Sequence, residues 1–196
     1  AGPVLLCALA ATLGGRKSRF TTMVSLGLVL SAAGDVFLEF DDNIRMPKNE
    51  LWFIAGLGSF LVAHLFYIAA FWSTRGPWNL PRALPFGLFG IAILYVLLPY
   101  VEDKLRVPVL VYGSVIAMMG VAASQRINSP LCSQQSATLA LLGAISFIAS
   151  DSALAINKFR TPLPYAKVIV IVTYYLAQLL ITLSARGGII SKPKSH

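Results

Sequence analysis

Apolar residues in this chain come in long blocks, separated by short connections that carry charges, Pro and Gly. Blocks of roughly 20 apolar residues are typical of helices that cross a membrane, whereas a helix of a soluble protein needs a polar face at helical period. The pattern therefore predicts an all-α, polytopic transmembrane helix bundle rather than a soluble helical domain. The predicted segments, in a single domain over residues 1–196, are 3–14, 20–38, 51–73, 82–100, 107–124, 135–157 and 163–185.

The first of these seven segments is too short to cross the hydrocarbon core. Three explanations stay open: it has lost its beginning, it is buried against a partner, or a further helix precedes it. The chain begins at Ala1 without an initiator Met or the charge pattern of a signal peptide. We therefore expect a truncated or processed product.

Composition supports a membrane protein: 57% of the residues are hydrophobic, 12% are charged, and the mean hydropathy is +0.73. The net charge of +8 raises the question of nucleic-acid binding. However, Lys and Arg fall in the short connections and form no basic face, so no nucleic-acid partner is expected. Basic loops instead suit anionic headgroups of membrane lipids. The connections on the side of the C-terminus lack acidic residues, and the positive-inside rule places that side in the cytosol.

Two aspartates occur in matching positions near the ends of apolar runs. Residues 33–38 and 149–154 share the order small, small, Asp, two others, Leu, with Asp35 and Asp151 as the acids. An ionisable residue inside a membrane span is costly, and function is the default interpretation. Alternation of the segments brings both acids near the same membrane side, which makes them a candidate acid/base pair. The structural alternative is that each Asp caps a helix or pairs with a loop cation such as Arg45 or Lys158.

Further polar side chains lie near this pair. Ser31 lies one turn before Asp35, and the neighbouring Gly34 lets another helix approach closely. His64 lies deep inside the third segment, with Tyr67 three residues further on. The His is either a hydrogen-bonded core residue or a functional one, acting as proton donor or acceptor or orienting a ligand.

The last two segments supply the other candidates for substrate binding. Asn157 and Lys158 follow Asp151, and the final segment carries Lys167, Tyr174 and Gln178. An interfacial aromatic residue and interhelical hydrogen bonds are the structural alternative. Lys167 lies near the membrane side of both aspartates, where it could extend to a headgroup phosphate.

Metal and cofactor chemistry are not expected. The Asp and His residues show no metal-ligand spacing, and Cys7 and Cys132 are isolated. The sequence also lacks a P-loop, a dinucleotide fingerprint and a nucleophile elbow. The buried acids therefore remain the leading candidates for chemistry.

Several motifs occur together in an order that resembles the YhhN-like lysoplasmalogenase family. The resemblance runs from about residue 3 to residue 185. The motifs are GDVFL at 34–38, FLVAHLFY at 60–67, SDSALA at 150–155, PLPYAK at 162–167 and YYLAQLLI at 174–181.

The resemblance implies an eight-helix integral membrane enzyme without a cofactor, in the endoplasmic reticulum or another intracellular membrane. Its substrate would be a lysoplasmalogen, whose vinyl ether bond is hydrolysed to give a fatty aldehyde and glycerophosphoethanolamine or glycerophosphocholine. The functional Asp and His positions of the family correspond to Asp35, Asp151 and His64. We expect the family's first helix to precede Ala1.

Vinyl ether hydrolysis explains the value of two carboxylates. A protonated acid donates a proton to the outer vinyl carbon, and an anionic partner stabilises the oxocarbenium ion and draws a proton from water. We expect Asp151 to be the acid and Asp35 the base, while His64 orients the water or a glycerol hydroxyl. The phosphate would meet Lys167, Lys158 or Arg160.

Two other functions fit the same residues. The first is a proton- or cation-coupled transporter or channel in which the acids and His64 form a relay, although the sequence lacks the interrupted half-helices expected at such sites. The second is a non-catalytic lipid-binding or scaffolding bundle, in which the carboxylates only hold helices together. Aldehyde formation in detergent, without a gradient, separates the enzyme from both.

Overall fold

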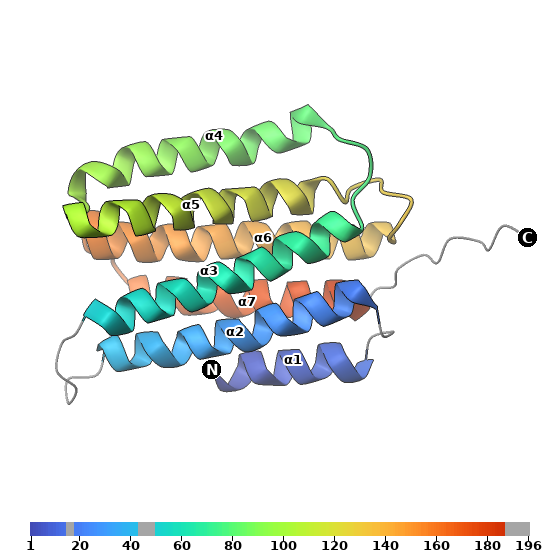
Figure 1. Cartoon of the computed structure of the whole chain (residues 1–196), viewed down its shortest axis with the longest axis horizontal. Helices are drawn as coiled ribbons and strands as arrows, with labels where there is room; N and C mark the ends of the chain where they lie inside the picture. The colour runs from blue at the N-terminus through green and yellow to red at the C-terminus, as the bar shows by residue number, and fades with distance from the viewer. Residues whose placement is uncertain (15–17, 43–49, 187–196) are drawn as a thin grey trace, which may run out of the picture.

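The computed structural model describes residues 1–14, 18–42 and 50–186, and these form seven α-helices (Figure 1). The prediction of an all-α bundle is confirmed. The helices are α1 (Gly2–Gly14), α2 (Arg19–Asp42), α3 (Glu50–Ser73), α4 (Leu80–Leu97), α5 (Asp103–Ser124), α6 (Gln134–Ala155) and α7 (Ala166–Arg186). A 3₁₀ turn, η1 (Leu98–Tyr100), follows α4, and a π-helical turn, η2 (Ile156–Arg160), extends α6.

Local signals set the helix ends, and some of them differ from the predicted segments. The side chain of Asn79 accepts a hydrogen bond from the backbone N–H of Arg82, and this cap starts α4 earlier than expected. In the same way, Ser133 caps α6. The last helix begins at Ala166 rather than residue 163, because the prolines at 162 and 164 disfavour helical conformation in the residues before them.

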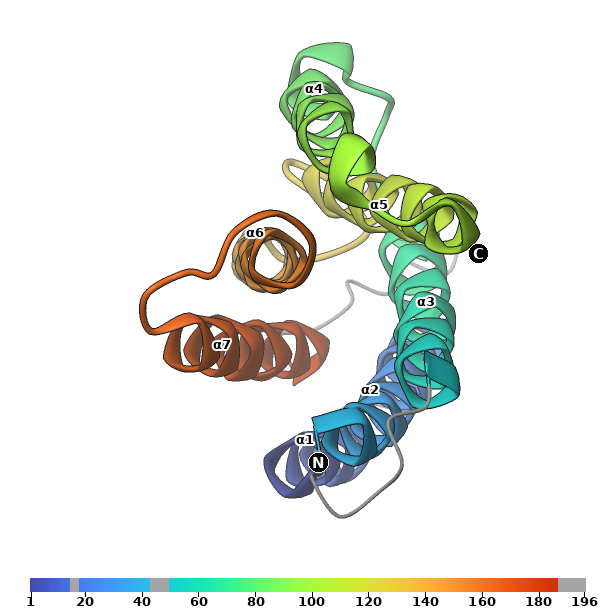
Figure 2. The same ribbon diagram turned by 90° about the vertical axis from the view of Figure 1, so that its left-hand side faces the viewer.

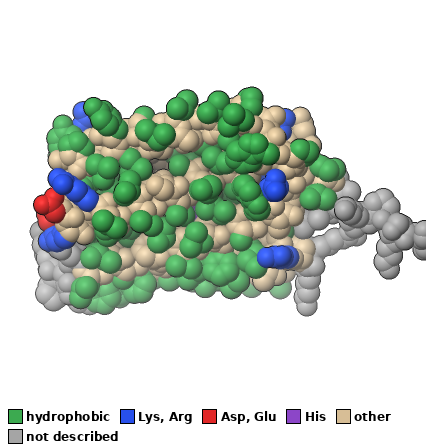
Figure 3. Space-filling model, turned by 45° about the horizontal axis from the view of Figure 1, so that its top comes forward, with side chains coloured by type: hydrophobic (Ala, Val, Ile, Leu, Met, Phe, Trp, Pro, Cys, Tyr) green, Lys and Arg blue, Asp and Glu red, His purple; other side chains and the backbone are tan. Residues whose placement is uncertain are grey.

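Six of the helices are long and apolar enough to cross a membrane, whereas α1 has only 13 residues. Large apolar side chains are exposed on the outer helices. On α4, for example, Leu88 is 62% exposed and Ile91 is 69% exposed. Hydrophobic side chains cover the middle of the face shown in Figure 3, and charged ones gather toward its two ends. This distribution is that of an integral, multi-pass membrane protein.

The helices run side by side with alternating direction (Figure 1). The view along the bundle shows α4, α5, α3 and α2 in a curved row, with α6 and α7 beside it and α1 near α2 (Figure 2). The most extensive contacts are between α2 and α3 and between α6 and α7, and α1 also packs against α7. The connections at 98–102 and 156–165 lie at one end of the bundle, which we call the acidic end because Asp35 and Asp151 lie toward it.

Small residues bring the paired helices close together. A Cβ atom at Gly34 would lie 2.6 Å from the Phe60 ring on α3, so the glycine makes room for that ring. Gly143 on α6 faces Ala177 and Ile181 on α7, and a Cβ there would lie 3.1 Å from the Ala177 carbonyl oxygen. Such close approach is the usual basis of helix packing in membranes, where apolar burial between helices gains little over lipid.

Candidate active site

A cavity of about 560 Å³ opens among the helices toward the acidic end of the bundle. Side chains from α2, α3, α4, α5, α6, η2 and α7 line it. Its lining on α4 and α5 is mostly apolar and includes Ile93, Leu94, Leu97, Val109 and Ile116, with Tyr112 as a polar member. The carboxylates and lysines of the lining come from α2, α6, η2 and α7. A volume of this size and an apolar lining with a few convergent polar groups are typical of small-molecule sites.

Asp35 and Asp151 both line this cavity, although more than a hundred residues separate them in the sequence. Asp35 lies two turns before α2 ends at Asp42, and Asp151 lies within α6. Neither acid is therefore at a helix terminus, and a capping role does not account for them. Arg45, the other partner considered for Asp35, lies outside the described residues.

Asp35 sits where three helices meet. Its side chain is 15% exposed, and Oδ2 lies 3.1 Å from the backbone nitrogen of Ala1 at the start of α1. Tyr174 on α7 lies near the carboxylate and also lines the cavity. The Tyr174 hydroxyl is buried and has no hydrogen-bond partner of good geometry among the described residues. The hydroxyl thus lies beside the Asp35 carboxylate without a well-formed hydrogen bond.

Asp151 has a different environment. The hydroxyl of Tyr112 on α5 donates a hydrogen bond to Asp151 Oδ2. One residue earlier, the hydroxyl of Ser150 donates to the Val170 carbonyl oxygen of α7 at 3.1 Å. Asp151 is thus fixed between α5 and α7. Its second oxygen, Oδ1, is the one left for a proton or a ligand.

Tyr112 is a site residue that the sequence analysis missed. It lies in an apolar run beside Gly113, and both line the cavity. A tyrosine hydroxyl inside a membrane span needs a hydrogen-bond partner. The need for such a partner could have identified Tyr112 as a candidate from the sequence. However, the sequence did not show that the partner would be Asp151.

His64 does not line the cavity. It is fully buried, with Nδ1 2.6 Å from the Phe60 carbonyl oxygen and Nε2 without a hydrogen-bond partner among the described residues. Its ring centroid lies 4.6 Å from that of Phe147 and 5.5 Å from that of Tyr112. His64 thus lies behind Tyr112, and its predicted role in orienting water or substrate stays a prediction.

Three of the other polar candidates form a buried layer rather than part of the lining. The Tyr67 hydroxyl donates to Gln178 Oε1 at 2.8 Å, and Ser31 Oγ lies 3.4 Å from the same hydroxyl. Gln178 lies one turn beyond Tyr174 on α7. Ser31, Tyr67 and Gln178 therefore hold α2, α3 and α7 together beneath the cavity, and none of the three lines it.

The cavity lining also includes Asn157, Lys158 and Lys167, as well as Glu39, which the sequence analysis had not selected. Glu39, Lys158 and Lys167 are exposed, and we call this solvent-facing part of the lining, with the adjoining Asn157, the mouth of the cavity. Asn157 Oδ1 accepts a hydrogen bond from the Leu163 backbone N–H at 3.0 Å and so fixes the connection to α7. Lys158 Nζ lies 3.6 Å from the centroid of the Phe53 ring, a cation–π contact.

Arg160, the third cation considered for a phosphate, lies outside this mouth. Its guanidinium carbon is 5.5 Å from the centroid of the Tyr100 ring, and the residue does not line the cavity. Lys158 and Lys167 are therefore the described cations in position to meet a phosphate there.

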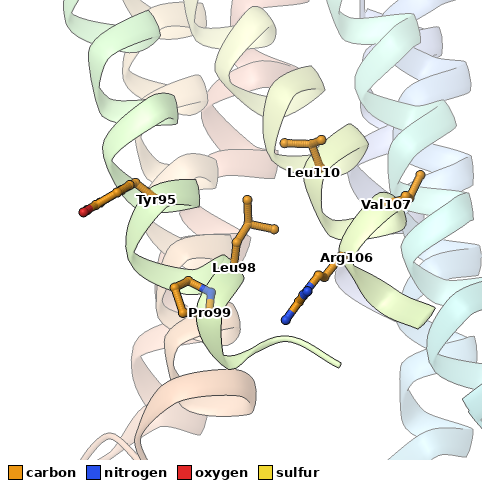
Figure 4. Close-up of a pocket in the computed structure, with 6 residues that line it drawn as sticks. All are labelled: Tyr95, Leu98, Pro99, Arg106, Val107 and Leu110. Atoms are coloured by element: carbon orange, nitrogen blue, oxygen red, sulfur yellow. The ribbon is translucent and has the colours of Figure 1, made fainter. Parts of the chain in front are cut away.

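A second cavity, of about 460 Å³, lies on the outer surface between α5 and the end of α4 (Figure 4). Its lining contains none of the candidate site residues; it consists of Tyr95, Leu98, Pro99, Arg106, Val107 and Leu110. Arg106 Nη1 is 2.8 Å from Asp103 Oδ1, so the charge in this cavity is already paired. We therefore centre the candidate active site on the inner cavity.

The described part of the chain holds no group of three His, Cys, Asp or Glu side chains arranged for a metal ion. The polar lining of the inner cavity includes carboxylates, tyrosines and lysines.

Comparison with known proteins gives matches over most of the chain. It is 37% identical to the human protein named lysoplasmalogenase TMEM86A over 169 residues, which cover 84% of this chain and 65% of that protein. It is 32% identical to human lysoplasmalogenase TMEM86B, covering 85% of the chain and 64% of the relative. A lysoplasmalogenase of Mycobacterium bovis is 30% identical, with 86% and 60% covered.

The chain thus spans somewhat less than two thirds of the length of these relatives. No solved structure matches it. The model of the YhhN family matches residues 1–185, which include every element that lines the cavity. On this evidence the chain belongs to the YhhN family.

Proposed function

We propose that this chain forms the catalytic membrane bundle of a lysoplasmalogenase, which hydrolyses the vinyl ether bond of a lysoplasmalogen. The products are a fatty aldehyde and glycerophosphoethanolamine or glycerophosphocholine. The observation that carries the proposal is that Asp35 and Asp151 line one cavity with an apolar wall. The names of the relatives support the same activity.

The two walls of the cavity suit the two parts of such a substrate. The alkenyl chain lies along the apolar side chains of α4 and α5, including Leu94 and Val109. The phosphate lies at the mouth, near Lys158 and Lys167. The vinyl ether, which joins chain to glycerol, then falls between the two carboxylates. Positioning of this kind supplies a large part of catalysis by itself.

The reaction needs a proton donor and a stabiliser of positive charge. Asp151, in its protonated form, donates its proton to the outer vinyl carbon, and the carbon bonded to the ether oxygen becomes an oxocarbenium ion. Oδ2 of Asp151 already accepts a hydrogen bond from the Tyr112 hydroxyl, so Oδ1 carries the proton that is transferred to the vinyl carbon. Asp35 remains anionic and stabilises the cation through space.

Water completes the hydrolysis. It adds to the oxocarbenium carbon while Asp35 accepts its proton. As the hemiacetal collapses to the aldehyde, Asp35 gives that proton to the departing glycerol oxygen and Asp151 takes the proton of the hemiacetal hydroxyl, which restores both side chains. No covalent bond to the protein is formed. The division of work between two carboxylates around an oxocarbenium-like state is that of glycosidases, by analogy of chemistry alone.

The buried layer positions these groups. Tyr112 orients Asp151, and His64 packs against the Tyr112 ring. Tyr67 and Gln178 support α7 beneath Tyr174, which lines the same cavity as Asp35. We assign His64 and Tyr67 a positioning role and reserve direct contact for Asp35, Asp151 and Tyr174.

The decisive experiment uses the purified protein in detergent, without a membrane gradient. Incubation with a lysoplasmalogen should release aldehyde, whereas the analogue with a saturated ether in place of the vinyl ether should release none. Absence of aldehyde from both would remove the enzyme proposal. The alternative of a transporter stays a prediction; His64, one member of its relay, lies outside the cavity lining. Residence in the endoplasmic reticulum stays a prediction, to be tested by fluorescence co-localisation.

A further inference from the structure

Two side chains of opposite charge line the cavity mouth without pairing with each other. Glu39 lies on α2, one turn beyond Asp35, and Lys167 lies in the first turn of α7. Both are exposed. Among the described residues neither forms an ion pair, so both charges are available to a ligand.

Four other charged residues at the acidic end form ion pairs with one another. Glu102 Oε2 is 3.1 Å from Lys104 Nζ, and Asp103 is paired with Arg106. None of these four lines the inner cavity. The lack of ion-pair partners at Glu39 and Lys167 is therefore a feature of the cavity mouth and not of this end of the molecule as a whole.

The wall beside Glu39 contains two tyrosines of α7. Tyr175 lines the cavity and lies close enough to Asp35 and Glu39 to interact electrostatically with both carboxylates. Tyr174 is 8% exposed, and its buried hydroxyl lies beside the Asp35 carboxylate. Carboxylates beside aromatic rings form a favourable environment for an ammonium group.

We propose that the mouth recognises a phosphoethanolamine headgroup, with its ammonium at Glu39 and its phosphate at Lys167. This inference rests on the proposed function, since it concerns the headgroup of the same substrate. A primary ammonium donates hydrogen bonds to a carboxylate, whereas the trimethylammonium of choline has no N–H to donate. The mouth therefore favours ethanolamine over choline, and Glu39 is the residue that discriminates.

Binding of saturated-ether lysolipids tests this inference without any reaction. The ligands are 1-alkyl-glycerophosphoethanolamine, its choline counterpart, and 1-alkyl-glycerophosphate, which lacks an ammonium. Affinity is measured with the purified protein in detergent, from the ligand-dependent rise of the unfolding temperature. The wild-type protein should bind the ethanolamine lipid about fivefold more tightly than the choline lipid, as befits a partly exposed charge-assisted hydrogen bond.

The variants separate the two charges. Glu39→Gln should weaken binding of the ethanolamine lipid about fivefold and leave the phosphate lipid unchanged. Lys167→Gln should weaken all three, because each carries a phosphate. Glu102→Gln, an acid at the same end but outside the cavity, should change none.

Two results would overturn the inference: an ethanolamine-to-phosphate affinity ratio that Glu39→Gln does not alter, or no binding of any lysolipid by the wild-type protein. The outcome is independent of aldehyde release. A protein that discriminates headgroups but releases no aldehyde would refute the proposed reaction and leave the headgroup site standing. Aldehyde release together with equal affinity for all three lipids would refute the headgroup site and leave the proposed reaction standing.

Discussion

At the scale of single residues, the two cavity carboxylates carry the chemistry. Asp35→Asn and Asp151→Asn keep the shape of each side chain but remove the ability to give or accept the proton. Each should lower aldehyde release by roughly 10²- to 10⁴-fold, the usual contribution of an acid or base. Asp103→Asn is the matched control, because Asp103 is exposed and outside the cavity. Near-normal turnover in a cavity variant would remove that residue from the mechanism.

Tyr112 is the residue whose role depends most directly on the structure. Tyr112→Phe keeps the ring that packs on His64 but deletes the hydroxyl that orients Asp151. We expect kcat to fall by about 2- to 10-fold, the worth of a hydrogen bond to the neutral, protonated Asp151, with KM nearly unchanged. Tyr95→Phe, on an exposed position of α4, serves as the control. A fall in thermal stability with normal kcat would show that the hydroxyl is only structural.

At the scale of helices, the contact between α6 and α7 holds the site together, since Asp151 lies on one and Tyr174 on the other. Gly143→Ala would place a Cβ 2.8 Å from Ile181 and 3.1 Å from the Ala177 carbonyl oxygen. We expect a loss of about 1–3 kcal/mol of stability, the usual cost of overpacking, seen as a lower unfolding temperature in detergent.

Gly87→Ala on α4 provides the comparison for that variant. A Cβ at Gly87 would meet nothing within 4 Å, so the change should be neutral or slightly stabilising through helix propensity. If both alanine variants melted at the wild-type temperature, close packing of α6 on α7 would not limit stability.

At the scale of the whole molecule, the two ends of the bundle have different roles: the acidic end holds the cavity, and the other end holds helices together. Opposite the acidic end, Arg126 is fully buried and its Nε and Nη2 donate to the hydroxyls of Thr74 and Ser136 at 2.9 and 2.8 Å. Its guanidinium also lies over the Phe20 ring, with the central carbon 4.3 Å from the ring centroid. Burial lowers the pKa of Arg126 to about 10, so the side chain is still charged at pH 7. It ties α2, α3 and α6 together far from the cavity.

Arg126→Met should therefore lower the stability of the protein without lowering its activity. Loss of the donors leaves buried hydroxyl and carbonyl acceptors unsatisfied, and we expect a cost of about 1–3 kcal/mol. Aldehyde release by the protein that remains folded should stay close to the wild-type rate. Arg106→Met, which removes a partly exposed cation at the acidic end, should cost less than 1 kcal/mol or so. A turnover defect in Arg126→Met at a temperature where it is folded would contradict this division.

The sequence by itself determined the helices and the depth of each polar residue along them. Apolar runs bounded by Pro, Gly and charges mark membrane spans, and counting along alternating helices places Asp35 and Asp151 near one membrane side. These properties are local, because the length and order of the runs decide them. The YhhN resemblance also came from the sequence motifs and is confirmed by the family match.

Only the tertiary structure decided which helices are neighbours and which way each side chain turns. Apolar residues surround these helices on every face, so no polar stripe marks the side that faces the protein, and in lipid small residues and hydrogen bonds select the partners. For this reason the sequence did not reveal that Tyr112 of α5 meets Asp151 of α6, that His64 lies behind the cavity, or that Glu39 and Lys167 share its mouth. Rotation about a helix axis and the choice of neighbour are properties of the assembled bundle.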